Sequence, residues 1–94
     1  MDENKNHFKN SSLNLSVFLI AKGMQLVGIE KHQFSNKATF IFSNNLRCEQ
    51  LTQIFNFAKA NDPETLIDAR KLLVELKNLK DRLYQATKYE TEQQ

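Results

Sequence analysis

The sequence predicts a single α+β domain, in which a β-hairpin packs against helices and the elements follow in the order α-β-β-α-α. Three observations support this prediction. Apolar residues recur at helical spacing in three segments of the chain. Two short runs rich in β-branched and aromatic residues separate the first of these segments from the second. The 94 residues, 40% of them hydrophobic and 26% charged, suffice for one hydrophobic core of ordinary composition.

The first predicted helix begins near Ser12 and ends at Gly23. Ser12 is expected to be the N-cap, because its hydroxyl can accept a hydrogen bond from an amide of the first turn. Gly23 is expected to cap the other end, because glycine adopts the left-handed conformation without a Cβ penalty. The apolar stripe between them has spacings of four, three and four residues: Leu13, Val17, Ile20 and Met24.

The two β-rich runs, Leu26–Lys31 and Ala38–Phe42, are predicted to form a hairpin. The six residues between them are polar apart from one phenylalanine, which suits a hairpin loop. Strand alternation places Phe40 and Phe42 on one face of the second strand, toward the core. In the first strand, Val27 and Ile29 are expected to share the core face.

Two further helices complete the predicted domain. Asn44 or Asn45 can cap the first of them, whose core stripe is Leu51, Ile54, Phe55 and Ala58. The sequence Asp62-Pro63-Glu64 ends that helix and starts the last one, because Asp is a good N-cap and proline is favoured at the first helical position. The last helix is expected to run from Pro63 to about Ala86. The predicted core consists of Phe40, Phe42, Leu51, Phe55 and Leu73.

Both ends of the chain are polar and lie outside the predicted domain. Residues 1–11 are expected to form a flexible N-terminal arm, residues 12–86 the single domain, and residues 87–94 a polar C-terminal tail. The acidic start is followed by no apolar leader, and no apolar run is long enough to span a bilayer. We therefore expect a cytoplasmic protein with no membrane partner.

Several of these features together resemble a known family. They are an apolar helix over residues 13–24 that ends in Lys22-Gly23, the aromatic strand Ala38–Phe42, and a helix after Asp62-Pro63 that carries Ala69-Arg70, Leu76-Lys77 and Leu83-Tyr84. The chain resembles, over about residues 12–85, a family of small prokaryotic and phage-associated proteins classed only as a domain of unknown function. The resemblance implies no activity, cofactor or catalytic residue.

The sequence predicts no enzymatic activity and no cofactor. The chain contains no phosphate-binding loop, nucleophile elbow or paired cysteines. A metal site made of Glu30, His32, Cys48 and Glu49 would need ligands from separate segments to converge, and a solvated hairpin tip is the favoured reading. Cys48 near a helix N-terminus is read as a structural thiol, because nothing in the sequence indicates a base beside it.

Association is the function that the sequence favours: a small protein-interaction module that forms a homodimer. The last helix carries two overlapping apolar rows, whereas one small core needs only one of them. The interface is predicted at Leu72, Leu76, Leu79 and Leu83. A two-stranded sheet also exposes edges that pairing between two copies would cover.

The alternative is a small nucleic-acid-binding accessory protein that uses the hairpin tip. Lys31, His32 and Lys37 lie around the predicted loop, where they could contact a phosphate backbone. The net charge of +2 is too small to favour a polyanionic partner by itself. The balanced charges of the last helix are typical of a solvated surface.

Overall fold

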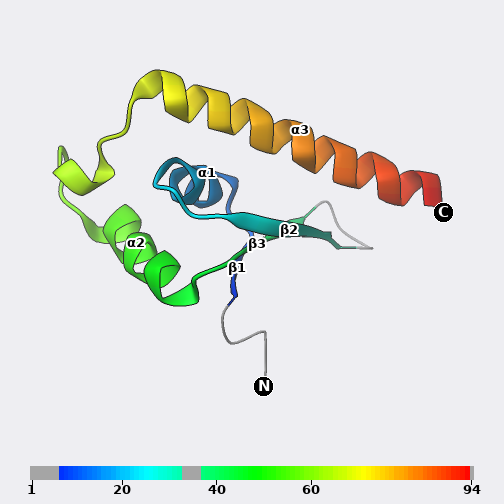
Figure 1. Cartoon of the computed structure of the whole chain (residues 1–94), viewed down its shortest axis with the longest axis horizontal. Helices are drawn as coiled ribbons and strands as arrows, with labels where there is room; N and C mark the ends of the chain where they lie inside the picture. The colour runs from blue at the N-terminus through cyan, green and yellow to red at the C-terminus, as the bar shows by residue number, and fades with distance from the viewer. Residues whose placement is uncertain (1–6, 33–36, 94) are drawn as a thin grey trace.

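A three-stranded antiparallel sheet with the strand order β1-β3-β2 lies against helices in the computed structural model, which describes residues 7–32 and 37–93, with side chains through residue 85 (Figure 1). The elements are β1 (Phe8–Asn10), α1 (Leu13–Ala21), β2 (Leu26–Lys31), β3 (Ala38–Phe42), α2 (Asn45–Phe57), a single 3-10 turn (Pro63–Thr65) and α3 (Ala69–Gln93). The α+β class, the hairpin, the element order from α1 onward and the long C-terminal helix are confirmed. Strand β1 was not predicted.

Helix α1 begins and ends as its sequence predicts. The Ser12 hydroxyl accepts a hydrogen bond from the Leu15 amide (3.1 Å). Gly23 has φ +100°, and two amide bonds close the helix end: Gly23 N–H to the Ile20 carbonyl and Met24 N–H to the Leu19 carbonyl, both 2.9 Å. This pair is a Schellman motif. The helix is apolar nearly all round, and it is buried accordingly.

The hairpin has the predicted strand bounds, but the side chains of β2 do not face the core in the predicted alternation. Leu26 pairs with Phe42 and Gly28 with Ile41, so a bulge displaces Val27 between them. Leu26 and Ile29 therefore pack against the core, while Val27 is exposed. The prediction that Val27 shares the core face with Ile29 is wrong, because the bulge interrupts the alternation of side chains.

Strand β1 corrects the expectation that all of residues 1–11 form an arm. Phe8 pairs with Phe42 and packs against the core, and Asn10 pairs with Phe40. The Asn10 side-chain carbonyl accepts hydrogen bonds from the Ser12 amide (2.8 Å) and from the hydroxyl of the buried Ser16 (3.3 Å). Strand β1 thus covers the free edge of β3 from within the chain, and it positions the start of α1.

Helix α3 begins later than predicted. Asp62 does act as an N-cap, accepting from the Glu64 amide (2.8 Å), but the turn that it caps ends at Thr65 and Leu66 is extended. A second aspartate then starts the long helix: the Asp68 carboxylate accepts from the amides of Arg70 (2.8 Å) and Lys71 (3.3 Å). The helix runs on to Gln93, through residues predicted to form a polar tail.

The core lies between the sheet and the helices. Phe40, Phe42 and Leu51 are buried in it as predicted. Phe55 is 39% exposed and Leu73 is 63% exposed, so both were wrongly placed in the core. Leu73 is exposed because the face that α3 turns inward passes through Leu79, which is 1% exposed, and Leu73 lies beside that face.

Candidate protein-interaction surface

The four leucines proposed as an interface lie on the inward face of α3. Leu79 is fully buried, and Leu72, Leu76 and Leu83 pack against the core cluster. Figure 1 shows α3 running along one side of the molecule, next to α1. The apolar row that seemed in excess for one small core is therefore the row that joins α3 to that core.

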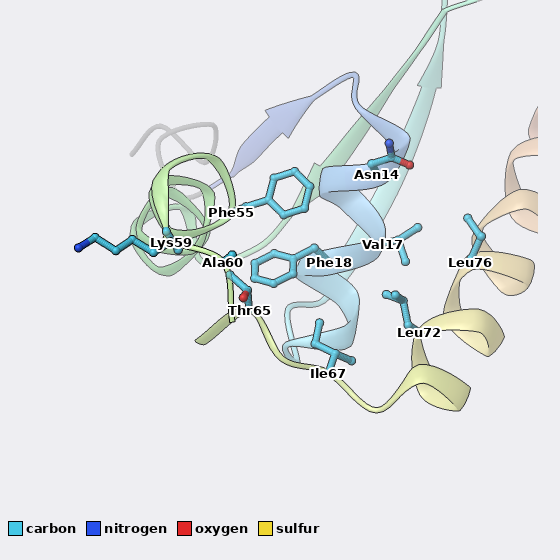
Figure 2. A pocket seen from close by; sticks show the side chains of 11 residues that line it. Asn14, Val17, Phe18, Phe55, Lys59, Ala60, Thr65, Ile67, Leu72 and Leu76 are labelled. Carbon is cyan, nitrogen blue, oxygen red and sulfur yellow. The ribbon is translucent and has the colours of Figure 1, made fainter. Parts of the chain in front are cut away.

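A cavity of about 570 Å³ opens where α1, α2 and α3 meet the segment that connects α2 to α3. We call it the interhelical groove (Figure 2). It is lined by Asn14, Val17, Phe18, Phe55, Ala58, Lys59, Ala60, Thr65, Ile67, Leu72 and Leu76. Leu72 and Leu76, two of the predicted interface leucines, thus contribute to its wall.

The groove owes its position to the route of the chain after α2. The backbone leaves α2 in an extended conformation at Ala58 and turns through Asn61, whose φ is +68°. After the 3-10 turn it is extended again at Leu66 and reaches α3 at Ala69. If α3 had begun at Pro63, this segment would be a turn of helix. Because it is extended instead, it forms one border of an open apolar space (Figure 2).

Two aromatic rings form one wall of the groove. The rings of Phe18 and Phe55 have centroids 5.1 Å apart and are tilted by 42°, a favourable aromatic pair. Phe18 is buried, whereas Phe55 keeps more than a third of its surface exposed. The pair therefore holds Phe55 in place while leaving part of its ring open to solvent.

The described residues that line the groove are mostly apolar and include few ionisable side chains. Among its described lining residues, Lys59 is the one that carries a charge, and Figure 2 shows its side chain extending away from the groove. No Asp, Glu, His or Cys belongs to that set. The side chains that do line the groove can bind apolar groups, but they offer no general acid, base or nucleophile.

Cys48 lies outside the groove and is fully buried. Its thiol contacts the Ser43 carbonyl oxygen at 3.5 Å, and burial raises the pKa of the thiol above its ordinary value. A raised pKa disfavours the reactive thiolate. These features fit the structural role that the sequence analysis favoured.

The hairpin tip does not gather the residues of the nucleic-acid alternative on one face. Lys31 pairs with the buried Ala38 and so lies on the same face of the sheet as the core. His32 hydrogen-bonds through Nε2 to the Thr39 hydroxyl (2.7 Å), and Thr39 alternates with Ala38 along β3. Lys37 lies at the base of the loop, its carbonyl accepting from the His32 amide (3.2 Å), and the loop tip lies outside the described residues.

Within residues 7–32 and 37–85, no three His, Cys, Asp or Glu side chains are grouped so as to hold a metal ion. Over the same residues, no helix has both the length and the apolar character needed to cross a membrane.

The comparisons with known proteins point to one family. The family model described as a domain of unknown function (DUF5659) matches residues 5–85. This range begins before β1, so the strand that the sequence analysis missed lies inside the family domain. No curated protein and no solved structure matches the chain.

Proposed function

We propose that this chain, which belongs to the family of the domain of unknown function DUF5659, is a non-enzymatic protein-interaction module. It binds an apolar segment of another protein in the interhelical groove, and it acts as a homodimer in the cytoplasm. The observation that carries the proposal is the groove itself: an open cavity of about 570 Å³ whose walls are mainly apolar.

The size and shape of the groove favour a side-chain cluster as the occupant. Pockets of about 300–1,000 Å³ commonly take a drug-sized ligand, but such sites hold the ligand in place with a few convergent polar groups. Here the polar side chains are Asn14, Thr65 and the outward-directed Lys59. An open apolar groove between helices suits the apolar face of an amphipathic helix, which needs few polar contacts inside the groove.

The lining supports binding without catalysis. Catalysis by proton transfer or nucleophilic attack needs titratable or nucleophilic side chains at the reacting atoms. The described groove residues include one weakly nucleophilic hydroxyl, Thr65, and no base beside it. The free buried thiol of Cys48 fits a reducing compartment, where cysteines stay unpaired.

Panning a displayed peptide library against the protein tests the groove. We expect enriched peptides to share apolar residues at helical spacing, and Phe55→Ser to weaken their binding by about tenfold or more, because it removes one wall of the site. Leu73→Ser is the control, because Leu73 is an exposed apolar side chain of α3 that does not line the groove. Circular dichroism verifies that both variants fold.

The groove proposal fails if no peptide is enriched, or if the two variants weaken binding equally. Nucleic-acid binding would be the better reading if labelled duplex bound in a salt-dependent way and Lys31→Glu with Lys37→Glu abolished that binding.

A further inference from the structure

Helix α2 carries a second apolar surface, on the side away from the groove. Leu46, Gln50, Gln53 and Phe57 follow one another at spacings of four, three and four residues and so form a single stripe, which we call the α2 stripe. Leu46 is 68% exposed and Phe57 is 75% exposed, the two highest values among the large hydrophobic side chains of the described residues. The α2 stripe therefore leaves its two apolar ends without cover in the monomer.

A shallow hollow of about 350 Å³ lies along this stripe. Its walls come from β1 and α2: Phe8, Leu46, Glu49, Gln50, Thr52 and Gln53. Phe57 is not among them, since it lies further along the helix. One α2 helix thus carries both an exposed aromatic ring and, near its other end, a hollow next to an exposed leucine.

This arrangement is self-complementary. A two-fold axis makes each copy use the same patch, so a contact from one residue to another occurs twice. If two α2 helices pack antiparallel with Leu46 facing Phe57 of the second copy, then Gln50 faces Gln53 of the second copy. In the same register, Phe57 of each copy reaches the hollow beside Leu46 of the second copy.

The charges of α2 allow such a contact. The stripe itself contains no charged residue; the two charged residues of α2, Arg47 and Glu49, lie beside it, and Glu49 belongs to the wall of the hollow. Arg47 is directed along the helix, where its guanidinium donates to the Gln50 side-chain carbonyl (3.2 Å). The amide hydrogens of Gln50 can then meet the carbonyl of Gln53 in the second copy.

Helix α3 provides the contrast. It carries an exposed stripe with the same spacing, made of Leu73, Lys77, Lys80 and Tyr84. Two lysines occupy the middle of that stripe, where α2 has two glutamines. Although Lys77 is paired with Asp81 (3.1 Å), a symmetric contact would bring the lysines of both copies together and remove water from them. A symmetric pair therefore suits α2 and not α3.

We propose that two copies of this chain associate through the α2 stripe, with the two helices antiparallel and Phe57 of each copy seated in the hollow beside Leu46 of the other. The proposal rests on the homodimer part of the proposed function and names its surface. It leaves both interhelical grooves open, because Phe55 and Phe57 lie about 200° apart around the helix. Because α2 has 13 residues, the contact is small and the dimer is expected to dissociate on dilution.

Sedimentation velocity over a concentration series tests the proposal. The wild-type mass is expected to rise from 11.0 kDa toward twice that value. Phe57→Ser is expected to raise the dissociation constant by about tenfold or more, since aromatic side chains seated in a partner's pocket dominate such contacts. Leu73→Ser on α3 is the matched control and is expected to leave the dissociation constant unchanged.

A charge pair tests the antiparallel register. One variant carries Gln50→Lys and Gln53→Lys, and the other carries Gln50→Glu and Gln53→Glu. Each is expected to be monomeric alone because like charges meet across the axis, and the two are expected to form a heterodimer when mixed.

The outcomes separate this proposal from the others. A wild-type monomer at every concentration overturns both the α2 contact and the homodimer, while peptide binding by the groove is judged separately. A wild-type dimer that tolerates Phe57→Ser, or charged variants that do not pair on mixing, overturns the α2 contact alone.

Discussion

Helices α1 and α2 use their apolar residues in different ways. In α1, six of nine residues are buried: Leu15, Ser16, Val17, Phe18, Leu19 and Ala21. In α2, two of thirteen are buried, Cys48 and Leu51. Figure 1 shows α1 between α2 and α3 with the sheet beside it, whereas α2 lies at the periphery. In a chain of this size, an apolar side chain is buried only where other elements surround it, and the rest of the apolar surface stays exposed.

The strongest test of this difference compares two phenylalanines. Phe18 of α1 is buried in the core cluster, so we expect Phe18→Ala to cost about 3–5 kcal/mol in the free energy of unfolding. Phe57 of α2 is mostly exposed, so Phe57→Ala is expected to cost less than about 0.5 kcal/mol. Urea denaturation measures both losses in unfolding free energy, at a protein concentration below the dissociation constant of the proposed dimer. Equal losses would show that α2 is as deeply embedded as α1.

Two leucines of α3 test which face of that helix is buried. Leu79 is fully buried and Leu73 is exposed. We expect Leu79→Ala to cost about 2–5 kcal/mol and Leu73→Ala less than about 0.5 kcal/mol. Thermal and urea unfolding give the two values. The opposite ranking would place the other apolar row of α3 against the core.

The two aspartates before α3 test where the long helix begins: after Asp62, as the sequence predicts, or after Asp68, as the structure shows. Asp68 caps the 25-residue helix, and Asp62 caps a turn of three residues. Removing a cap costs about 0.5–2 kcal/mol. We expect Asp68→Ala to fall within this range and to lower the helix content seen by circular dichroism, whereas Asp62→Ala should leave the helix content unchanged. If Asp62→Ala had the larger effect, the helix would begin at Pro63.

The smallest expected effect concerns Cys48, the buried thiol of α2. Because burial raises the pKa of this thiol, the folded chain keeps its proton at a pH where the unfolded chain has lost it. The contribution of Cys48 to stability is thus complete below the ordinary thiol pKa and is lost as the pH rises above it. We expect the urea midpoint to fall slightly more at alkaline pH in the wild type than in Cys48→Ala, and disulfide reagents to react with Cys48 only on unfolding.

Local signals in the sequence were sufficient for much of the fold. Ser12 and Gly23 delimit α1 by their own backbone chemistry, and the strands of the hairpin are long enough to show their composition. Strand β1 has three residues, too few for a pattern, and the bulge at Val27 depends on pairing with β3. Asp62 and Asp68 are both caps, and their sequence does not say which one starts the long helix.

The candidate surfaces were harder to predict, because each depends on more than one element. The sequence placed Phe55 in the core since it follows Leu51 by one helical turn. Its exposure depends on the extended segment after α2, which opens the groove beside it. The row Leu72, Leu76, Leu79 and Leu83 was hard to assign for a related reason: all four pack in or against the core, and Leu72 and Leu76 also line the groove. An apolar row that the core needs looks the same in sequence as one that a partner covers.

The central claim is that α2 leaves apolar surface for a second copy of the chain. Amide spectra of the labelled protein, recorded by NMR over a dilution series, test it most directly. The account predicts that the concentration-dependent shifts are confined to the outer side of α2, around Leu46 and Phe57, and to Phe8 beside the hollow. Shifts that centre on the exposed face of α3 around Leu73, or a spectrum that does not change with concentration, would contradict it.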